Sequence, residues 1–412
     1  MKIYHRLRIK LSIAFIIMTL IPTLIIGIYA IQVASQTLQT QTLAKQTEQV
    51  KILENMIRSF LSIVKGDLLF LSQSAPLREY LNLHTVLMSD SRSESVPASS
   101  VEATVQAVHN ILEQKQKALE QEFLAFSRYR RIYYQVRYLD EIGQEIARVD
   151  ADQFKSWIIE KDSLQNNADQ DHFKEAMRLS SKQIFVSKLD LNRKQGQIEI
   201  PYNPVIRYAV NVYYPNNQRA GVVMVNVDAN QFLQALGDAL LIDQEGFFLH
   251  HPNPKKGWGG PNDLRTGVTF EKDYPQIAPQ ISHRSGTLST STIALSYQRI
   301  IVPGSSQQWT LLVLHDTHEI FKGMAKFHLA FNIILTTAIV IAILFAIILS
   351  TKITRPIEQL TRIAEAISKG ELIENRVEIN DKGEIGQLAQ AFERMRVSMI
   401  KSFEKLRKQS RI

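Results

Sequence analysis

Two uncharged apolar stretches constrain this chain more than any other feature of its sequence. The second stretch runs from Leu329 to Leu349 and continues directly into the polar segment 354–360, Thr-Arg-Pro-Ile-Glu-Gln-Leu. The first runs from Leu11 to Ile31 and contains Pro22 and Gly27. Because a helix needs about twenty apolar residues to cross the hydrocarbon core of a bilayer, both stretches predict transmembrane helices.

A cleaved signal peptide is the alternative for the first stretch. Its apolar run is longer than the central region of most signal peptides, and no clear Ala-x-Ala cleavage site follows it. The stretch also continues into a segment with helical periodicity. We therefore interpret residues 11–31 as an uncleaved membrane anchor.

The distribution of Lys and Arg predicts how the chain crosses the membrane. Cations cluster before the first span and after the second, and few lie next to the other two span ends. The flanking cations are Lys2, Arg6, Arg8 and Lys10 before the first span and Lys352, Arg355, Arg362 and Lys369 after the second. Next to the other two span ends we find only Lys45 after the first span, and Lys322 and Lys326 before the second. Since cytoplasmic flanks carry the excess of cations, both termini are predicted to be cytoplasmic in a bacterial plasma membrane, with residues 32–326 outside.

Composition excludes some functions. The 412 residues are enough for two or three domains. The chain has no cysteine, which rules out disulfides and thiolate metal sites. Its formal charge of +8 lies partly in residues 1–10 beside the membrane. No stripe of Lys and Arg with interleaved aromatic residues is present, so we predict no nucleic-acid partner.

The external part begins with two helical stretches. From Gln32 to about Leu81 apolar residues recur at helical spacing, which predicts one long helix that continues the first span. A polar loop at 89–100 separates it from a second helix, about Val101 to Arg128. Together they predict an antiparallel helical stalk.

Strand signals follow the stalk and predict an α+β architecture with antiparallel sheets. The first unit, about 101–237, has a hairpin at 132–140 and 145–149, a helix at 170–183, strands near 184–189, 205–213 and 221–227, and a short helix at 228–237. The second unit, about 238–316, has a hairpin at 240–250 and strands near 285–290, 293–302 and 309–315.

Three segments of this external part resemble double Cache sensor domains. Residues 134–149, Tyr-Gln-Val-Arg-Tyr-Leu-Asp-Glu-Ile-Gly-Gln-Glu-Ile-Ala-Arg-Val, and residues 187–207 resemble the membrane-distal module, and residues 242–259 resemble the membrane-proximal one. The resemblance covers most of residues 35–320. It implies two PAS-like sheets in tandem, with a small-molecule pocket that usually lies in the distal module. Such domains are the periplasmic ends of histidine kinases, diguanylate cyclases and chemoreceptors.

The segment after the second span carries two amphipathic stripes. The first consists of Ile357, Leu360, Ile363 and Ile367, and Gly370 is predicted to end its helix. The second consists of Ile385, Leu388, Phe392, Met395 and Met399, which follow a heptad. Neither helix can bury its stripe alone, so a parallel homodimer forming a four-helix bundle is predicted. An ordinary juxtamembrane hairpin is the alternative.

Residues 350–400 resemble a HAMP domain. The match includes Pro356 at the start of the first helix, and Glu384 and Gly386 at the start of the second. The acidic residue that usually precedes this Glu is Gly383 here, and Asp381 is a substitute for part of its role. The resemblance implies that Pro356, Glu384, Ile385, Gly386, Leu388, Phe392 and Met395 relay the signal. Beyond Met399 the stripe resumes at Phe403 after a step of four, a stutter that locally unwinds a coiled coil or else marks fraying, so residues 401–412 are interpreted as the start of a signalling helix.

The cytoplasmic segment contains no recognisable catalytic motif. No histidine follows His328, and no nucleotide-binding loop, Gly-Gly-Asp-Glu-Phe signature or long chemoreceptor hairpin is present. We therefore expect no catalytic residues and no cofactor. His315 and His318 have metal spacing on a helix but lack a carboxylate triad beyond Asp316 and Glu319, and His250 and His251 lie at a strand end beside prolines, so no metal is predicted.

The candidate ligand-binding residues lie on predicted strands. Alternation along 132–140 places Tyr133, Gln135 and Arg137 on one face, where Arg137 can meet an anionic ligand bidentately. Further candidates on later strands are Asp190, Tyr202 and Arg207. The alternative is that Arg137 pairs with an acidic residue and stabilises the sheet. Residues 129–134 do not match the Tyr-x-Arg-Trp-Tyr pattern of amino-acid-binding double Cache domains, which disfavours an amino-acid ligand.

Together these features predict a two-span receptor that senses an external small molecule. A cytoplasmic kinase, cyclase or chemotaxis-type partner would receive the signal. The alternative is the N-terminal sensor part of a histidine kinase or diguanylate cyclase whose catalytic domain lies beyond Ile412. An adhesion or solute-capture protein is a third interpretation, and it would not need the heptad tail.

Overall fold

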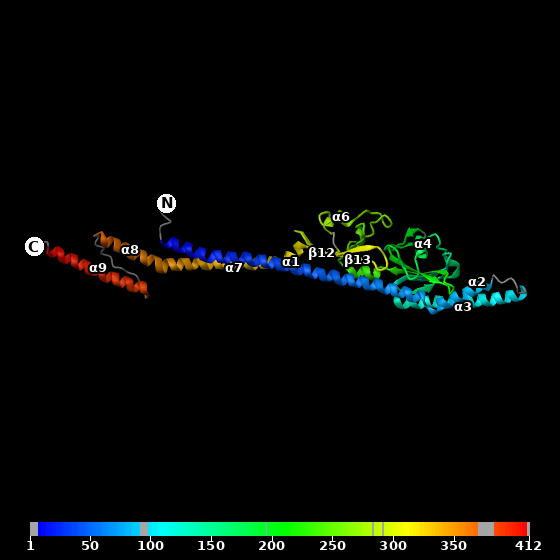
Figure 1. The fold of residues 1–412 in the computed structure, drawn as a ribbon. Helices are drawn as coiled ribbons and strands as arrows, with labels where there is room; N and C mark the ends of the chain where they lie inside the picture. Colours follow the sequence, from blue (N-terminus) through cyan, green and yellow to red (C-terminus); the bar gives the residue numbers. More distant parts are fainter. Residues whose placement is uncertain are drawn as a thin grey trace. The chain divides into compact units, whose positions relative to one another are not determined.

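The computed structural model describes residues 7–90, 98–194, 196–281, 284–290, 292–369 and 383–409. The chain forms two compact units. One comprises Met1–Thr40 and His318–Ile412, and the other comprises Gln41–Thr317. Figure 1 shows the elements of each. Part of the predicted loop at 89–100, together with Gly370 and Asp381, lies outside the described residues.

Three helices open the chain. They are α1 (Leu7–Ser72), α2 (Ala75–Asp90) and α3 (Ala98–Arg130). The predicted single helix to Leu81 is wrong, because the helix breaks at Gln73 and Ser74. Pro76 lies in the first turn of α2, the position where a missing N–H does least harm. The α2 helix then packs against α3.

The larger sheet is antiparallel throughout and has the order β3-β2-β1-β9-β8-β4, with β5 also paired to β8. Its strands are β1 (Tyr133–Leu139), β2 (Glu145–Ala151), β3 (Ser156–Ile158), β4 (Ile184–Val186), β5 (Asp190–Leu191), β8 (Pro204–Tyr213) and β9 (Arg219–Asp228). The hairpin β6 (Arg193–Lys194) and β7 (Gln197–Ile198) lies beside it. Two short helices, α4 (Asp171–Arg178) and α5 (Asn230–Leu233), complete what we call the large-sheet module.

The two faces of the larger sheet have different chemistry. Side chains such as Val136, Tyr138 and Tyr208 join a hydrophobic core with the helices, including Ile57 and Leu61 of α1. The alternate residues point to the other face, where part of the surface packs on Phe173 and Ala176 of α4. The rest of that second face is polar, and it is this part that forms the site described below.

The smaller sheet has the order β11-β10-β14-β13-β12 and is also antiparallel. Its strands are β10 (Leu240–Ile242), β11 (Phe248–His250), β12 (Ser285–Ser289), β13 (Ile293–Ile301) and β14 (Gln308–Asp316), and α6 (Phe270–Asp273) accompanies them. We call this part the small-sheet module. Trp309 stacks on Phe232 of the large-sheet module, with ring centroids 6.1 Å apart, so the two modules share one core.

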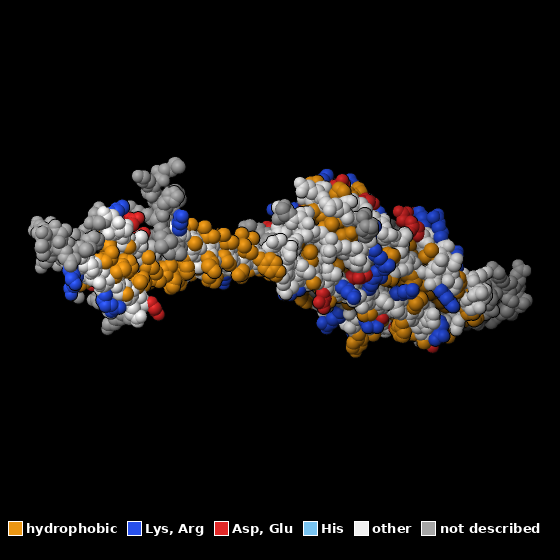
Figure 2. All heavy atoms as spheres, turned by 60° about the vertical axis from the view of Figure 1, so that its left-hand side comes forward, with side chains coloured by type: hydrophobic (Ala, Val, Ile, Leu, Met, Phe, Trp, Pro, Cys, Tyr) orange, Lys and Arg blue, Asp and Glu red, His pale blue; other side chains and the backbone are white. Residues whose placement is uncertain are grey.

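The other unit contains the membrane helices. The first part of α1 and the helix α7 (Thr317–Leu349) are long and apolar enough to cross a bilayer. Figure 2 shows hydrophobic side chains covering their surface. Phe15 stacks on Phe345 at 4.8 Å between centroids. Gly27 allows close approach, since a Cβ there would lie 1.9 Å from the ring of Phe331.

The helices after α7 follow the predicted pattern. A π-helical turn, Ser350–Thr354, joins α7 to α8 (Arg355–Ser368), and α9 spans Glu384–Gln409. Pro356 lies in the first turn of α8. Proline cannot donate a backbone hydrogen bond to the preceding turn, and the widened π-helical turn lies directly before it.

Candidate functional site

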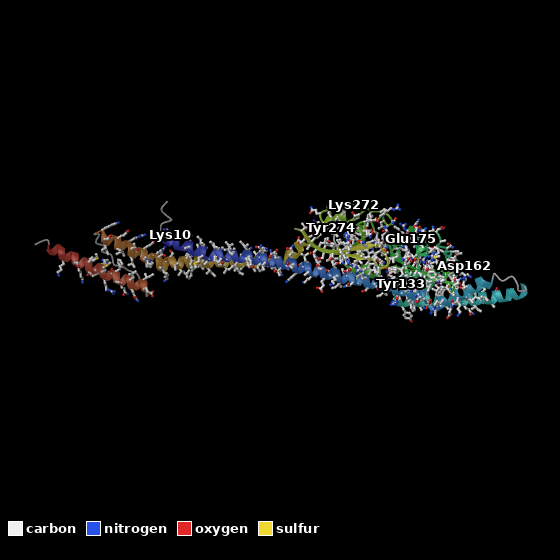
Figure 3. All side chains as sticks on the ribbon, viewed as in Figure 1. Lys10, Tyr133, Asp162, Glu175, Lys272 and Tyr274 are labelled. Carbon is white, nitrogen blue, oxygen red and sulfur yellow. The ribbon has the colours of Figure 1, made fainter. Side chains whose placement is uncertain are left out.

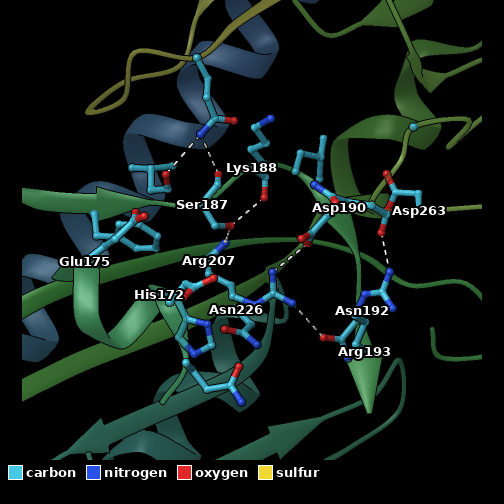
Figure 4. A pocket seen from close by; sticks show the side chains of 18 of the residues that line it. His172, Glu175, Ser187, Lys188, Asp190, Asn192, Arg193, Arg207, Asn226 and Asp263 are labelled. Atoms are coloured by element: carbon cyan, nitrogen blue, oxygen red, sulfur yellow. Dashed lines mark hydrogen bonds and ion pairs between the residues drawn. The ribbon is translucent and has the colours of Figure 1, made fainter. Parts of the chain in front are cut away.

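A cleft of about 1250 Å³ opens on the polar face of the larger sheet (Figure 4). Binding pockets for small molecules usually have about 300–1000 Å³, so this cleft has room for one. Both sheet modules contribute to its wall. Its polar lining includes Gln135, Arg137, Arg148, His172, Lys188, Asp190, Asn192, Arg207 and Asn226 from the large-sheet module, and Asp243, Glu245, Asp263 and Gln307 from the small-sheet module.

The alternation of three adjacent strands places the sheet side chains in the cleft. Arg137 of β1, Arg207 of β8 and Asn226 of β9 all lie on the face opposite the helices. The Asn226 amide donates to Gln135 at 2.9 Å and its oxygen accepts from Arg137 at 3.3 Å. Neighbouring strands thus form a continuous polar floor.

Arg137 is buried and paired with an acidic residue. Only 6% of it is exposed, and its Nη1 donates to Oε1 of Glu145 at 3.1 Å. Glu145, 1% exposed, also accepts from the backbone N–H of Gln165 at 3.0 Å and from Asn167 at 3.1 Å. A second cation, Arg148, reaches Glu145 at 3.5 Å. The carboxylate of Glu145 therefore holds the floor of the cleft together.

Arg207 is the more accessible cation. Its Nη1 donates to Asp190 at 2.8 Å and its Nη2 to Asn192 at 3.4 Å. Two of its five N–H groups are thus used, and no other partner for its side chain is seen within the described ranges. In Figure 4 its guanidinium group lies between His172 and Asn226 on one side and Asn192 on the other.

His172 projects from α4 toward the same two arginines. Burial is the main cause that lowers the pKa of its imidazole to about 3, and the charges of Arg137 and Arg207 lower it further. The imidazole is therefore neutral at pH 7. Its Nε2 and the Nε of Arg137 are both buried and have no hydrogen-bond partner among the described residues.

The segment Ser187–Asn192, which we call the strap, connects the two modules beside the cleft. The Gln307 amide donates to the carbonyl oxygens of Val186 and Ser187, at 3.2 and 2.9 Å. The Asp263 carboxylate accepts from the backbone N–H of Leu191 at 2.9 Å. The strap therefore carries the partners of Arg207 and is itself held by the small-sheet module.

Three of the five predicted ligand-binding residues line the cleft, namely Arg137, Asp190 and Arg207. The prediction that Tyr133 shares their face is wrong. A bulge interrupts the pairing of β1 with β9 between Tyr133 and Gln135, so Tyr133 turns toward the helices and donates to Asp67 of α1 at 2.7 Å. Figure 3 labels Tyr133 on the helix side of the sheet and Glu175 on the other.

Tyr202 is also outside the cleft lining, and half of its surface is exposed. Sequence reasoning missed His172, Asn192 and Asn226. Asn226 had a usable signal, because it interrupts an apolar β-strand. His172 had none, since a single histidine in a short polar helix is unremarkable without its tertiary neighbours.

The predicted relay residues lie at the expected places of α8 and α9. Glu384 is the first residue of α9 and Gly386 is buried. Within one chain Leu388 and Met395 remain 48% and 44% exposed. Ile385 and Phe392 are partly buried. The apolar stripe of α9 is therefore incompletely covered by its own chain.

In the described part of the chain no group of three or more acidic or histidine side chains could hold a metal ion. The ring nitrogen of His315 contacts the Gln46 amide of α1 at 2.7 Å. His250 contacts the Gly237 carbonyl at 3.0 Å.

Tandem antiparallel sheets on a long helix, with two membrane helices and a C-terminal HAMP segment, define a Cache-type membrane receptor. A family model described as the sensor domain of bacterial histidine kinases matches residues 76–305, which is more than half of the chain. The chain therefore belongs to this family. A HAMP domain model matches residues 348–401.

Solved structures support the same fold. The extracellular domain of a candidate histidine kinase, vpHK1S-Z8, is 20% identical and has a TM-score of 0.54, covering 70% of this chain and 94% of that one. A domain of a sensory box/GGDEF family protein from Vibrio parahaemolyticus is 20% identical with a TM-score of 0.53, covering 69% of this chain and 98% of that one.

One curated relative matches along nearly the whole chain. It is the methyl-accepting chemotaxis protein TlpA of Bacillus subtilis (strain 168), 21% identical over 402 residues. The match covers 95% of this chain and 51% of the relative. The chain thus spans about half the length of that protein.

Proposed function

We propose that the chain is a transmembrane receptor whose cleft binds an external small molecule and whose HAMP segment passes the resulting change to a cytoplasmic output. The observation that carries the proposal is the cleft itself. It is polar, it is lined by both sheet modules, and it contains Arg207 with N–H donors that no described residue uses. Arg137, Asp190 and Arg207 are the proposed ligand-binding residues.

The strap suggests how binding affects the sensor unit. A ligand that competes for the N–H groups of Arg207 changes its contact with Asp190 and Asn192, and so moves the strap against Asp263 and Gln307. The small-sheet module is in turn bonded to α1, since the Gln46 amide donates to the Ala294 carbonyl at 3.2 Å. A ligand shifts such an equilibrium only by its different affinity for the two states.

We further propose the membrane arrangement and domain boundaries given by the sequence. Residues 1–10 and 350–412 lie in the cytoplasm, spans occupy 11–31 and 329–349, and residues 32–326 form the external sensor in the bacterial inner membrane. The module at 101–237 is then membrane-distal and the module at 238–316 is membrane-proximal. The asymmetry of Lys and Arg supports this arrangement.

The proposed receptor is a parallel homodimer. The exposed stripe of α9, with Leu388, Met395 and Met399 each more than a third exposed, needs a second copy to become buried, and a heptad stripe favours a coiled-coil contact. The residues Pro356, Glu384, Ile385, Gly386, Leu388, Phe392 and Met395 would relay the signal through this bundle.

Three cytoplasmic outputs are proposed. The sensor family indicates a histidine kinase, of which this chain would be the N-terminal part, and the Bacillus subtilis relative indicates a chemotaxis-type partner. A diguanylate cyclase is the third candidate output. Phosphotransfer and methylation assays on cells that express the receptor, with and without Leu388→Glu, would distinguish the kinase and chemotaxis outputs.

The absence of cysteine allows a direct test of dimerisation and topology. Single cysteines introduced at Leu388 and, as a matched control, at the exposed neighbouring Gln387 are oxidised in native membranes. We expect a disulfide-linked dimer for Leu388→Cys and much less for Gln387→Cys. A cysteine at Asp162, in the sensor, should react with a membrane-impermeant thiol reagent in intact spheroplasts, whereas one at Gln387 should not. Equal labelling of both would contradict the proposed topology.

Ligand binding is tested with the full chain in lipid nanodiscs. We expect at least one compound in a panel of organic acids, amines and neutral amides to raise the melting temperature with increasing concentration. Arg207→Gln should abolish that increase, while Arg78→Gln, an exposed position on α2, should preserve it. An increase that survives Arg207→Gln would remove this residue from the site.

A further inference from the structure

Three nitrogen-bearing groups line the cleft from three different elements. They are the guanidinium groups of Arg137 on β1 and Arg207 on β8, and the imidazole of His172 on α4. Figure 4 shows His172 and Arg207 beside Asn226, whose side-chain oxygen accepts a hydrogen bond from Arg137. We call this group the nitrogen triad.

The triad holds more hydrogen-bonding capacity than the described protein atoms use. Nε of Arg137 and Nε2 of His172 are buried without a partner. A buried polar atom without a partner costs about 1–3 kcal/mol, and both side chains line the cleft, so a molecule bound against them would supply hydrogen-bond partners that the described residues do not. The unused N–H groups of Arg207 add further donors.

The two carboxylates that contact the arginines of the triad are already paired. Glu145 is occupied by Arg137, Arg148, Asn167 and the Gln165 backbone. Asp190 is held by Arg207 at the other side of the guanidinium group. The carboxylates therefore neutralise the arginines but leave the inward-facing nitrogen atoms unpaired.

We propose, on the basis of the function proposed above, that the nitrogen triad binds the carboxylate group of a small organic acid and that His172 takes up a proton when the acid binds. A carboxylate offers two oxygen atoms in one plane, which matches the fork of an arginine and leaves lone pairs for a neighbouring N–H. The remaining volume of the cleft accommodates the rest of the acid.

Proton uptake follows from the charges that face His172. In the empty cleft Arg137 and Arg207 oppose a positive charge on the imidazole, and Asp171 and Glu175 of its own helix are exposed to solvent. Across the cleft, Asp190 is already paired with Arg207. An anion placed between the arginines and the imidazole reverses the local field and favours the charged form, which then donates from Nε2.

The test is isothermal titration calorimetry on the full chain in nanodiscs, with acetate, succinate and citrate as carboxylate probes. Succinamide, putrescine and inorganic phosphate serve as neutral, cationic and tetrahedral anionic comparisons. We expect a carboxylate to bind and succinamide not to bind. Titrations in buffers with different ionisation enthalpies should show net proton uptake, and the affinity should rise by up to tenfold per pH unit from pH 7.5 to 5.5.

The variant that tests His172 is His172→Gln, whose amide can still donate but does not titrate. It should bind the carboxylate with little pH dependence and without proton uptake, and Lys174→Gln, at an exposed position of the same helix outside the cleft lining, should behave like the unchanged protein. Circular dichroism of both variants checks that they are folded. If His172→Gln fails to fold, the buffer dependence of the unchanged protein still decides the question.

Several results would overturn the inference. The ligand class would be wrong if succinamide or putrescine bound and no carboxylate did, or if phosphate bound as tightly as the best carboxylate. The inference would also fail if a carboxylate bound without proton uptake, or if no carboxylate bound. In the first two cases the receptor function of the cleft would stand while its ligand class would be wrong. The cysteine experiments on topology and dimerisation do not depend on any of these results.

Discussion

The carboxylate of Asp263 accepts a hydrogen bond from the backbone N–H of Leu191 at 2.9 Å, and this contact joins the two sheet modules. Leu191 lies between Asp190 and Asn192, which both contact Arg207. Asp263, together with Gln307 at the other end of the strap, therefore holds the backbone segment that positions the accessible cation of the cleft. Burial raises the pKa of Asp263, and the nearby carboxylates of Asp190 and Asp243 raise it further.

The first prediction concerns this contact. Asp263→Ala leaves the Leu191 N–H without its partner and should lower the free energy of unfolding by about 1–3 kcal/mol. It should also weaken signalling more than ligand binding, because the strap keeps its contact with Arg207 but loses one of its links to the small-sheet module, and only the Gln307 contacts remain. Urea unfolding followed by tryptophan fluorescence measures the first effect. All three tryptophans, Trp157, Trp258 and Trp309, lie in the sensor unit.

Asp162→Ala is the matched control, because Asp162 is an exposed aspartate of the same unit. It should leave both unfolding and signalling close to the unchanged protein. A normal signal from Asp263→Ala at saturating ligand would show that the strap does not couple the modules.

The second prediction concerns Glu145. Replacing it by Gln removes the charge shared by Arg137 and Arg148 in a site where Glu145 is 1% exposed. Removing one partner of a buried ion pair typically costs about 3–5 kcal/mol. We therefore expect Glu145→Gln to shift the urea midpoint strongly to lower concentration, and Glu160→Gln, an exposed neighbour, to shift it little. Equal midpoints for the two variants would show that the network contributes nothing to stability.

The third prediction separates Tyr133 from ligand binding. Its hydroxyl donates to Asp67, which is 4% exposed and also pairs with Arg130 at 2.5 Å. Tyr133→Phe should lower the free energy of unfolding by about 1 kcal/mol and leave ligand affinity unchanged, since the bulge turns this residue away from the cleft. Calorimetry on the variant checks the affinity. A tenfold or larger loss of ligand affinity in a folded variant would show that Tyr133 contributes to the binding site.

Tyr133 also shows where sequence reasoning reaches its limit. Strand alternation correctly placed Gln135 and Arg137 on one face, because a pleated strand alternates regardless of its neighbours. The β-bulge that reverses Tyr133 arises from pairing with β9, almost a hundred residues later in the chain. Local patterns contain no information about such a register shift.

The fold itself was predictable because it depends on local patterns. Apolar spans, helical stripes and β-branched runs each encode one local period, and the strands β8 and β9 lie within one or two residues of their predicted bounds. The cleft was not predictable, because His172, Asn192 and Asp263 come from separate segments that only the tertiary fold brings together. Arg207 was identified as a candidate, but its partner Asn192 was not.

The fourth prediction concerns acid stability. The pKa of His172 is lowered in the folded state, so the folded protein binds fewer protons there than the unfolded chain. Its contribution to stability is complete above pH 6.5 and is lost as the pH falls toward 3. Between pH 6.5 and 5 the loss should be about 1–2 kcal/mol without ligand. Urea titrations of the unchanged protein and His172→Gln should diverge over this range, and parallel curves would contradict the assignment.

The last prediction compares two glycines. Gly221 of β9 has φ of +125°, and a Cβ there would lie 2.0 Å from the Leu139 carbonyl oxygen. Because the obstacle is backbone of the neighbouring strand rather than a movable side chain, Gly221→Ala should destabilise the larger sheet by several kcal/mol, on the order of the largest single-residue effects. A Cβ added at Gly66 of α1 would meet no atom within 4 Å. Alanine is favoured over glycine inside a helix by about 1 kcal/mol, so Gly66→Ala should raise the urea midpoint while Gly221→Ala lowers it or prevents folding. If both variants shift the midpoint in the same direction, the close approach of β9 to β1 at this position is wrong.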